Sequence, residues 1–520
     1  MTPDIPILAI DLGTSGPKVA LVTIAGDILA WEFEPVRLTL LPHGGAEQRA
    51  EEWWEAIGQA ARRLTAATGI TRVAAVGVTA QWSGTVAVGS DNQPLAGAII
   101  WMDSRGAPDI RTLVAGRPTI AGYGATKLMT WIRLTGGAPG LAGKDPLAHI
   151  LYLRRAHPDV YRATSVFLEP KDYINLRLTG VRAASFDSIT LHWLTDNRVI
   201  DRVDYAPQLL ALTGVERAKL PDLRRATDIL GPLTADAAVH LGVEPGAPVA
   251  AGSSDIHSAA VGAGAVRDYD ANLYVGTSSW LVCHVPFKRT DLLHNMASLP
   301  AAIPGKYLLT NEQECAGACL TFLRDNLLFP DDEFTTSRPE RFYDLLDRVV
   351  EREAPGSGGV IFTPWLYGER TPVEDHTVRG GFHNLSLTTT RAQMMRAVME
   401  GVAYNMRWLH DAVQRCIRRP PGTIIMTGGG AQSGVWGQIF ADVLGRPIYR
   451  TAHPILANAH GAALIAAVAI GRRSFDDIAA PIAVVYRPHP EHTPIYDELF
   501  RAFIRIYRQN REVYARLNRR

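Results

Sequence analysis

The hydrophobic pattern at the start of the chain alternates short apolar runs with glycine-containing turns. Apolar residues dominate 7–10 and 19–24, and a third apolar run, ILAWEFE, follows Gly26 and Asp27. Short apolar runs joined by tight turns predict an antiparallel meander of three strands. The next segment, AEEWWEAIGQAARRLTAAT, has the apolar spacing of one helix face, and residues 73–88 predict a strand that leads into a turn.

The second half of the chain repeats this arrangement. Residues 271–285, ANLYVGTSSWLVCHV, again predict a strand, a Gly-Thr-Ser turn and a strand, and residues 422–440 predict a strand, a glycine-rich turn and a helix. A three-residue match is weak alone, but the shared context predicts two related α/β halves that face each other across a cleft. The prolines and glycines of VEPGAPVAAGSSD place the boundary so that the domains cover 1–250 and 251–520.

Asp11 ends the first apolar run, where a buried carboxylate needs a partner. The glycine-rich turn from Gly13 to Gly16 can bring backbone N–H groups close to an anion. The second half contributes a Gly-Thr-Ser turn and a Gly-Gly-Gly turn. Together the three turns favour a nucleotide whose phosphates are bound from both halves, with Asp11 beside a Mg²⁺ ion. Taken alone, Asp11 is better explained as a turn-capping residue and Lys18 as a solvated strand charge. The sequence contains no P-loop and no Rossmann fingerprint.

Composition excludes several partners. The 520 residues are 47% hydrophobic and 20% charged, an ordinary globular balance, and the 53 Lys and Arg against 52 Asp and Glu leave a net charge of +1. Such a balance offers no electrostatic footprint for nucleic acid or an anionic membrane, so neither partner is expected. The four cysteines indicate core packing in a reducing compartment, and the first residues lack the basic region of a signal peptide. The apolar stretch ANAHGAALIAAVAIG is too short to span a bilayer, so a cytoplasmic protein is expected.

The order and spacing of a series of blocks resembles the FGGY carbohydrate kinases, a branch of the actin/hexokinase-like (ribonuclease H-like) ATPases. The blocks cover nearly the whole chain: IDLGTSGPK (10–18), AQWSG (80–84), WMDSR (101–105), EPKDYINLRLTG (169–180), AGSSDIHSAAVGAG (251–264), VGTSS (275–279), LYGERTP (366–372), GGFHNLSLTTTRAQMMRAVMEGVAYN (380–405) and TGGGAQSGVWGQIFADVLGRPI (427–448). The resemblance implies a two-domain α/β fold with an interdomain cleft and ATP- and Mg²⁺-dependent phosphorylation of a small sugar or polyol. A homodimer is one possible assembly.

The resemblance also implies roles for particular residues. Asp255 takes the position of the catalytic aspartate, which accepts the proton of the attacking hydroxyl. The alternative for Asp255 is a helix N-cap, and the two roles are compatible. The other implied residues are Asp11 for the metal; Gly13, Thr14, Ser15, Lys18, Gly276, Thr277 and Ser278 for the phosphates; and Gly428, Gly429, Gly430, Ala431 and Ser433 for the adenosine. For the nearby Trp436, helix packing is the stronger interpretation.

The sugar site implied by the resemblance consists of Gln81, Trp82, Ser83 and Asp103 together with Asp255. Xylulokinases carry Gln-Met-His-Gly at this turn and glycerol kinases carry Arg-Glu, and neither type is reproduced here. Trp82 is explained equally well as a platform for a sugar face and as a packing residue. A xylulose-like ketose is the default substrate. The alternatives are another polyol or sugar acid (glycerol, erythritol, gluconate) or a non-catalytic, actin-like nucleotide or sugar sensor.

Overall fold

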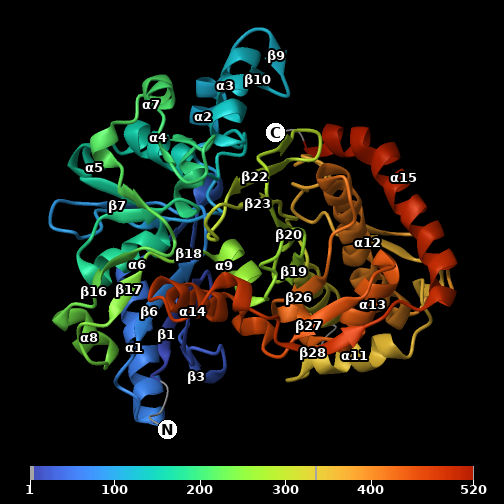
Figure 1. The fold of residues 1–520 in the computed structure, drawn as a ribbon. Helices are drawn as coiled ribbons and strands as arrows, with labels where there is room; N and C mark the ends of the chain where they lie inside the picture. The colour runs from blue at the N-terminus through green and yellow to red at the C-terminus, as the bar shows by residue number, and fades with distance from the viewer. Residues whose placement is uncertain (1–4, 334–336, 519–520) are drawn as a thin grey trace.

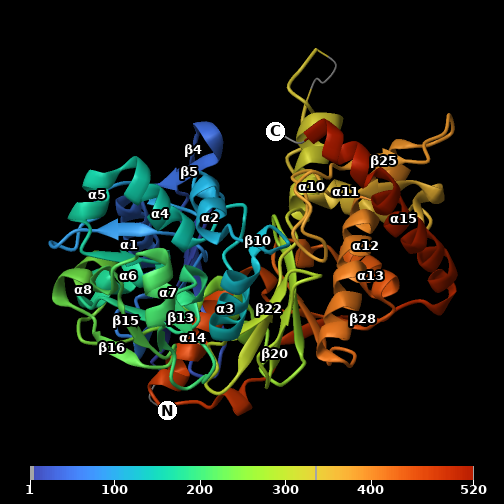
Figure 2. The same cartoon turned by 90° about the horizontal axis from the view of Figure 1, so that it is seen from above.

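The chain forms two lobes, which Figure 1 shows side by side, blue to green on the left and yellow to red on the right. The structure, a computed structural model, describes residues 5–333 and 337–518. Each lobe is built around one large mixed sheet covered by helices, as the view in Figure 2 also shows.

The sheet of the first lobe grows from the predicted meander. Its strands lie in the order β16–β17–β6–β1–β2–β3, and β18 also pairs with β6. The bounds are β1 (Ile7–Gly13), β2 (Gly16–Val22), β3 (Ile28–Phe33), β6 (Ala75–Ala80), β16 (Ile229–Pro232), β17 (Pro248–Ala250) and β18 (Ser253–Ser254). Strands β1 to β3 are antiparallel neighbours, which confirms the meander. Helix α1 (Ala50–Thr68), which packs against β2 and β3, coincides with the predicted helix.

The second sheet repeats the core of the first. Its order is β21–β22–β23–β20–β19–β26–β27–β28. The bounds are β19 (Ala271–Val275), β20 (Ser279–Val285), β21 (Thr290–Asp291), β22 (Met296–Pro300), β23 (Tyr307–Thr310), β26 (Ile424–Thr427), β27 (Ile448–Thr451) and β28 (Ile482–Tyr486). In both sheets an antiparallel hairpin, β1–β2 or β19–β20, is followed by parallel strands, β6 and β17 or β26 and β27. The predicted repeat is therefore confirmed, whereas the division at residue 250 stays a prediction, since β18 still pairs with β6.

Shorter elements complete the lobes. The remaining strands are β4 (Thr39–Leu41), β5 (Gly45–Gln48), β7 (Val86–Val88), β8 (Ala98–Ile99), β9 (Thr119–Ile120), β10 (Tyr123–Gly124), β11 (Val166–Leu168), β12 (Ala183–Ser185), β13 (Thr195–Asp196), β14 (Asp204–Tyr205), β15 (Asp222–Arg224), β24 (Ile361–Thr363) and β25 (Gly381–His383). The other helices are α2 (Ala107–Val114), α3 (Ala125–Thr135), α4 (Pro146–Ala156), α5 (Pro158–Ala163), α6 (Pro170–Thr179), α7 (Pro207–Thr213), α8 (Ala235–Leu241), α10 (Gly317–Phe322) and α11 (Phe342–Glu351).

A pair of helices, α9 (Asp255–Gly262) and α14 (Ala457–Ala469), joins late chain segments to the first lobe. Alanines of α14 pack on β1 and β6, although β1 lies at the start of the chain and α14 near its end. The two helices touch backbone to backbone, because a Cβ on Gly262 would lie 1.9 Å from the carbonyl oxygen of Ala457 and one on Gly461 would lie 1.9 Å from that of Ser258. This contact fixes α9, and with it Asp255, against the first sheet.

The second lobe also contains the long helix α12 (Arg391–Ile417), whose start is stabilised by a capping box between Thr390 and Gln393. Helix α13 (Gly434–Leu444) packs beside it, and α15 (Thr493–Asn518) runs along the outer edge of the lobe (Figure 1). The four cysteines are buried and free, and the burial of Cys315 and Cys319 in the core confirms the packing expected for these two. Within the described ranges, no helix combines the length and apolar character that crossing a membrane requires.

Substituting Gly461 with Ala is expected to lower the free energy of unfolding by about 1–3 kcal/mol, because the added methyl group collides with the Ser258 carbonyl. Thermal denaturation of the purified protein measures the change. Gly381→Ala is the matched control, since a Cβ there meets no atom within 4 Å and its effect should stay within about 0.5 kcal/mol. Equal thermal midpoints for the two variants would show that α9 and α14 do not depend on this close approach.

Candidate active site

Asp11 lies near the end of β1 with its side chain almost completely buried, at 1% exposure. Its Oδ2 accepts a hydrogen bond from the Lys18 Nζ at 3.2 Å, since the two residues face each other across the β1–β2 ladder. Its Oδ1 is also buried and has no hydrogen-bond partner among the described residues. An unsatisfied carboxylate oxygen is costly in a protein interior, and it is the type of ligand that Mg²⁺ prefers. The residue therefore fits the metal role expected for it.

The equivalent hairpin of the second sheet carries no charge at this position. Tyr274 precedes the Gly276 turn as Asp11 precedes the Gly13 turn, and it pairs across the ladder with Trp280. The two rings stack with centroids 4.0 Å apart. The pKa of Tyr274 is raised by burial and then by the charges of Asp11 and Asp255. The ends of the two sheets therefore approach each other at this point.

The first predicted phosphate turn is held by a polar network. The Thr14 hydroxyl donates to Gln81 Oε1 at 2.9 Å and accepts from Trp101 Nε1 at 3.0 Å. The Gln48 amide donates to the Thr14 carbonyl at 2.8 Å and accepts from Gln81 Nε2 at 2.8 Å. The Gln81 amide is thus engaged in holding the turn, and a contact between Gln81 and sugar stays a prediction.

The backbone of this turn requires glycine at one position. Gly16 has a φ of 144°, and a Cβ on it would lie 2.0 Å from the Glu34 carbonyl oxygen. Gly13 faces Gly16 across the hairpin, and Ser15 between them is exposed. Gly16 therefore lets the turn pack directly against the backbone of Glu34 and Pro35, and an approach of phosphate to the turn stays a prediction.

The predicted sugar turn places Trp82 and Ser83 next to α9. The Trp82 indole is half-buried, donates to the Ser188 carbonyl at 2.8 Å and meets the His257 ring edge to face at 5.3 Å. Ser83 has a φ of 67° and donates to the Lys144 carbonyl at 2.8 Å. Both side chains are oriented by hydrogen bonds to backbone carbonyls, which fixes their positions beside α9.

Asp103 is engaged with other protein groups. One oxygen accepts from the Ala46 N–H at 2.9 Å and from the Arg105 guanidinium at 2.6 Å, and the other accepts from the Arg105 N–H at 2.9 Å. Arg105 also pairs with Glu47. These contacts explain Asp103 as a buried anchor of its loop, and a hydrogen bond from Asp103 to substrate stays a prediction.

Asp255 is the first residue of α9, and Ser254 occupies the N-cap position. The Asp255 Oδ1 accepts a hydrogen bond from the Ile256 N–H at 2.8 Å. Burial raises the pKa of this carboxyl to about 8, and the negative charges of Asp11 and Glu312 add to the shift. Two carboxylates from different elements, Asp11 and Asp255, are thus brought within electrostatic reach of each other.

Two further carboxylates, which the sequence analysis did not identify as site residues, lie beside Asp255. Glu169 accepts from the Gly84 N–H at 2.9 Å, and Asp187 accepts from the Ser254 N–H at 3.0 Å. Each has a second buried oxygen without a partner among the described residues. Burial raises the pKa of both groups. Glu169 follows the apolar strand β11, the same signal that marks Asp11, whereas nothing in the pattern around Asp187 distinguishes it.

The second predicted phosphate turn joins β19 to β20. The carbonyl of Gly276 accepts from the Gly317 N–H at 2.8 Å, and the carbonyl of Thr277 accepts from the Ala316 N–H at 2.9 Å. The Gly276 N–H donates to the Ser278 carbonyl at 2.9 Å. The Thr277 side chain is exposed. Its hydroxyl is therefore available to a ligand.

The glycine-rich turn after β26 passes directly behind the second phosphate turn. Gly428 has a φ of 90°, and a Cβ on it would lie 2.5 Å from the Val275 carbonyl oxygen. A Cβ on Gly430 would also meet Val275, whereas one on Gly429 would meet nothing within 4 Å. Ala431 is buried. The turn leaves open space beside Gly429, next to the backbone expected to contact adenosine.

Ser433 connects this turn to α13. Its hydroxyl accepts from the Trp436 N–H at 3.0 Å as the N-cap of the helix and donates to Asp347 at 2.7 Å. Trp436 is 1% exposed and donates to the Met399 carbonyl, which confirms its packing role. Because the Ser433 hydroxyl is used in both directions within the protein, its contact with adenosine stays a prediction.

The two lobes and their repeated strand order form a two-domain fold of the actin- and hexokinase-like type. Residues 6–262 match the N-terminal domain of the FGGY family of carbohydrate kinases, and residues 271–470 match its C-terminal domain. The chain belongs to this family. It is a sugar kinase, and its relation to other kinases implies that it uses ATP.

Characterised relatives align along nearly the whole chain. A xylulose kinase of Escherichia coli is 28% identical, with 96% of this chain and 98% of the relative covered, and a gluconokinase of Bacillus subtilis is 26% identical, with 94% and 92% covered. The fold matches that of a xylulose kinase from Brucella ovis, with a TM-score of 0.85, 24% identity and coverage of 97% and 99%. A gluconate kinase from Lactobacillus acidophilus gives a TM-score of 0.84 at 24% identity, with coverage of 98% and 99%.

The buried charge of Asp255 predicts a pH-dependent effect on stability. Its pKa of about 8 exceeds the value of about 3.9 in an unfolded chain, so its contribution to stability is fully present below pH 4 and is lost as the pH rises to about 8. Asp255→Asn keeps the hydrogen bond from Ile256 but removes the charge. The difference in thermal midpoint between the variant and the wild type should shift in favour of the variant as the pH rises from about 5 to 8. The measurement is made without nucleotide. A constant difference across this range would contradict the raised pKa.

Proposed function

We propose that this enzyme transfers the γ-phosphoryl group of ATP to a hydroxyl of a small neutral ketose of the xylulose type. The observation that carries the proposal is the pair of carboxylates from separate elements, Asp11 with an unpartnered buried oxygen and Asp255 with a pKa of about 8. Phosphoryl transfer to an alcohol needs one group that accepts the proton of the hydroxyl and another that helps to neutralise the negative charge of the phosphates.

Asp255 is the general base in this proposal. Its carboxylate takes the proton from the sugar hydroxyl while the oxygen of that hydroxyl forms a bond to the γ-phosphorus, and the bond to the β–γ bridging oxygen breaks to release ADP. A base with a pKa close to the working pH combines availability with proton affinity. The close contact between α9 and α14 holds the base in place.

Asp11 is the residue that would hold Mg²⁺, through its free Oδ1. The ion, when bound, would neutralise charge on the phosphates of ATP. Lys18 pairs with the other oxygen of Asp11 and so offsets the charge of this carboxylate. The turns at Gly13–Ser15 and Gly276–Ser278 would offer backbone N–H groups to the phosphates, and Gly428–Ala431 would lie against adenosine.

The preference for a neutral sugar follows from the groups at the sugar turn. Gln81, Trp82 and Ser83 are uncharged, and a sugar acid would need a cation to pair with its carboxylate. The half-buried Trp82 ring offers an apolar platform beside Asp255. The xylulose kinases among the relatives support the same class. A sugar acid is the second candidate, because gluconokinases align at 26% and 24% identity.

Coupled ADP-release assays against ketopentoses, aldonates, tetritols and glycerol test the substrate class. We expect a ketopentose to raise ADP release well above the basal rate and to give a higher kcat/KM than gluconate. A higher value for gluconate would favour the sugar-acid alternative. ATP turnover that stays flat across the whole panel would favour a nucleotide or sugar sensor and would contradict the kinase proposal for small sugars.

Conservative replacement of the two carboxylates separates their roles. Asp255→Asn should lower kcat by about 10²–10⁴-fold, the usual contribution of a general base, while nucleotide affinity changes little. Asp11→Asn should instead raise the Mg²⁺ concentration needed for half-maximal turnover. Kinetics at varied Mg²⁺ and calorimetric titration with ATP measure both effects. Near-normal turnover by Asp255→Asn would show that another carboxylate is the base.

A further inference from the structure

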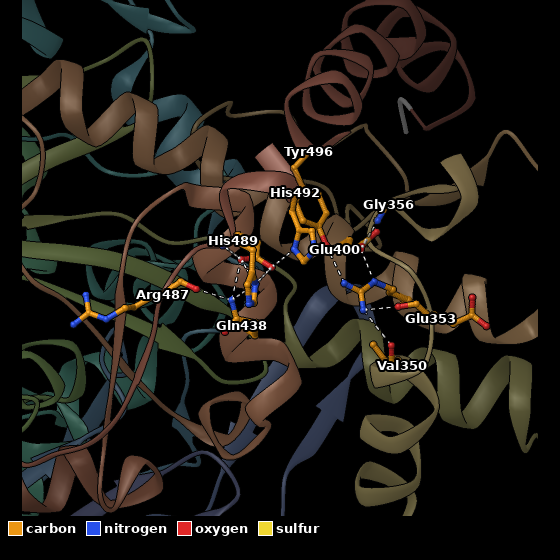
Figure 3. Close-up of polar contacts among 11 residues, drawn as sticks. Val350, Glu353, Gly356, Glu400, Gln438, Arg487, His489, His492 and Tyr496 are labelled. Atoms are coloured by element: carbon orange, nitrogen blue, oxygen red, sulfur yellow. Dashed lines mark hydrogen bonds and ion pairs between the residues drawn. The ribbon is translucent and has the colours of Figure 1, made fainter. Parts of the chain in front are cut away.

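A second group of chemically active side chains lies far along the chain from the carboxylates described above. Asp442 is in the last turn of α13. His489 caps a 3₁₀ turn, Pro490–His492, that leads into α15, and His492 is the last residue of that turn. Figure 3 shows the two imidazoles pointing toward the same region between these elements. The ligand atoms of all three residues lie within 4.8 Å of one another.

The distances within this Asp-His-His cluster are close to those of a metal centre. The Nδ1 of His489 lies 3.2 Å from one oxygen of Asp442, and the Nδ1 of His492 lies 2.9 Å from the other. Two ligands of a tetrahedral zinc ion, each at about 2.1 Å, are about 3.4 Å apart. Small rotations of the side chains would therefore bring all three into coordination distance of one ion.

Hydrogen bonds orient the Asp442 carboxylate. Its Oδ1 accepts from the His489 backbone N–H at 2.8 Å and from Gln438 Nε2 at 2.8 Å. The Gln438 Nε2 also donates to the Arg487 carbonyl at 2.8 Å and lies 3.1 Å from the His489 Nδ1. These contacts hold the carboxylate beside both imidazole nitrogens, as a metal ion bound between them would require.

The charge of Asp442 also lacks a permanent counter-ion. The side chain is 3% exposed, and its ion-pair partners within the described residues are only His489 and His492. A buried carboxylate that pairs only with imidazoles, and with no Lys or Arg among the described residues, is suited to a cation, because burial of an unbalanced charge is costly. His489 and His492 are 47% and 27% exposed, so an ion from solvent can reach their side of the cluster.

We propose that Asp442, His489 and His492 form a binding site for a divalent transition-metal ion, with Zn²⁺ as the representative cation. Two imidazoles and one carboxylate suit Zn²⁺ and its neighbours in the first transition row, whereas Mg²⁺ selects sites made of oxygen ligands. A water molecule from the exposed side completes a tetrahedral set. The site is separate in ligands and chemistry from the Mg²⁺ role assigned to Asp11.

Metal binding at this place would fasten α15 to α13. One turn after His492, Tyr496 donates to Glu400 at 2.9 Å and accepts from Arg396 at 2.9 Å, both on α12 (Figure 3). The start of α15 is thus already anchored on one side, and the metal would anchor it on the other. Helix α13 begins at Gly434 with Ser433 as its N-cap, directly after the glycine turn, so the site would stiffen the helix that follows the proposed adenosine contact.

The test is Zn²⁺ binding to the metal-stripped, full-length protein in excess Mg²⁺, without ATP or sugar. We expect one equivalent of Zn²⁺ by calorimetry and elemental analysis, visible absorption typical of tetrahedral Co²⁺ when Co²⁺ replaces it, and a Zn²⁺-dependent rise in thermal midpoint. His489→Gln and His492→Gln should each weaken Zn²⁺ binding by about 100-fold or more. The control His157→Gln removes an exposed imidazole of the first lobe and should leave binding unchanged.

Two results would overturn the proposal. One is the absence of saturable Zn²⁺ uptake by the wild type, and the other is equally strong uptake by both histidine variants. Circular dichroism of the metal-free variants checks that each is folded, and the high exposure of His489 makes His489→Gln the safer of the two. Because these measurements involve no phosphoryl transfer, their outcome is independent of the proposed kinase substrate.

Discussion

The confinement of two carboxylates, Asp11 and Asp255, to one poorly solvated region is the constraint on which the rest of the structure depends. Burial and the negative charge of Asp11 both disfavour ionisation of Asp255 and raise its pKa. The arrangement persists because the surroundings fix each group separately: Lys18 pairs with Asp11, and the Ile256 N–H donates to Asp255. A protein that holds such a pair is suited to bind a cation and to accept a proton, the two requirements of a phosphoryl-transfer site.

The two sheets share a strand order but differ where the chemistry lies. The β1–β2 hairpin carries the Asp11–Lys18 ion pair, and the β19–β20 hairpin carries the stacked Tyr274–Trp280 pair at the same register. The repeated architecture therefore supplies two glycine turns of the same kind, while the charged groups are concentrated on one side. The Tyr274–Trp280 pair is uncharged, and the charges of Asp11 and Asp255 contribute to the raised pKa of Tyr274.

Helix packing joins the parts of the chain that form the site. Small residues on α9 and α14 allow the two backbones to touch, and the alanines of α14 cover the strand that carries Asp11. The base and the metal ligand are thus held by one continuous unit, although the segments come from the beginning, the middle and the end of the chain. The Asp-His-His cluster extends this principle to α13 and α15, whose ends meet at Asp442.

The sequence alone determined the local elements and the residues that interrupt them. Short apolar runs, the glycine turns and the helix pattern of 50–68 predicted the meander, its repeat and α1, because these features depend on neighbours a few residues away. Asp11 and Glu169 carry the same signal, an acid directly after a buried run. Only the tertiary structure decided that Gln81 and Asp103 are engaged with protein groups, that Asp187 lies beneath α9, and that Asp442 meets two histidines nearly 50 residues further along the chain. Those facts depend on long-range packing, which decides which hydrogen-bond partners lie beside each side chain. No local sequence pattern encodes that packing.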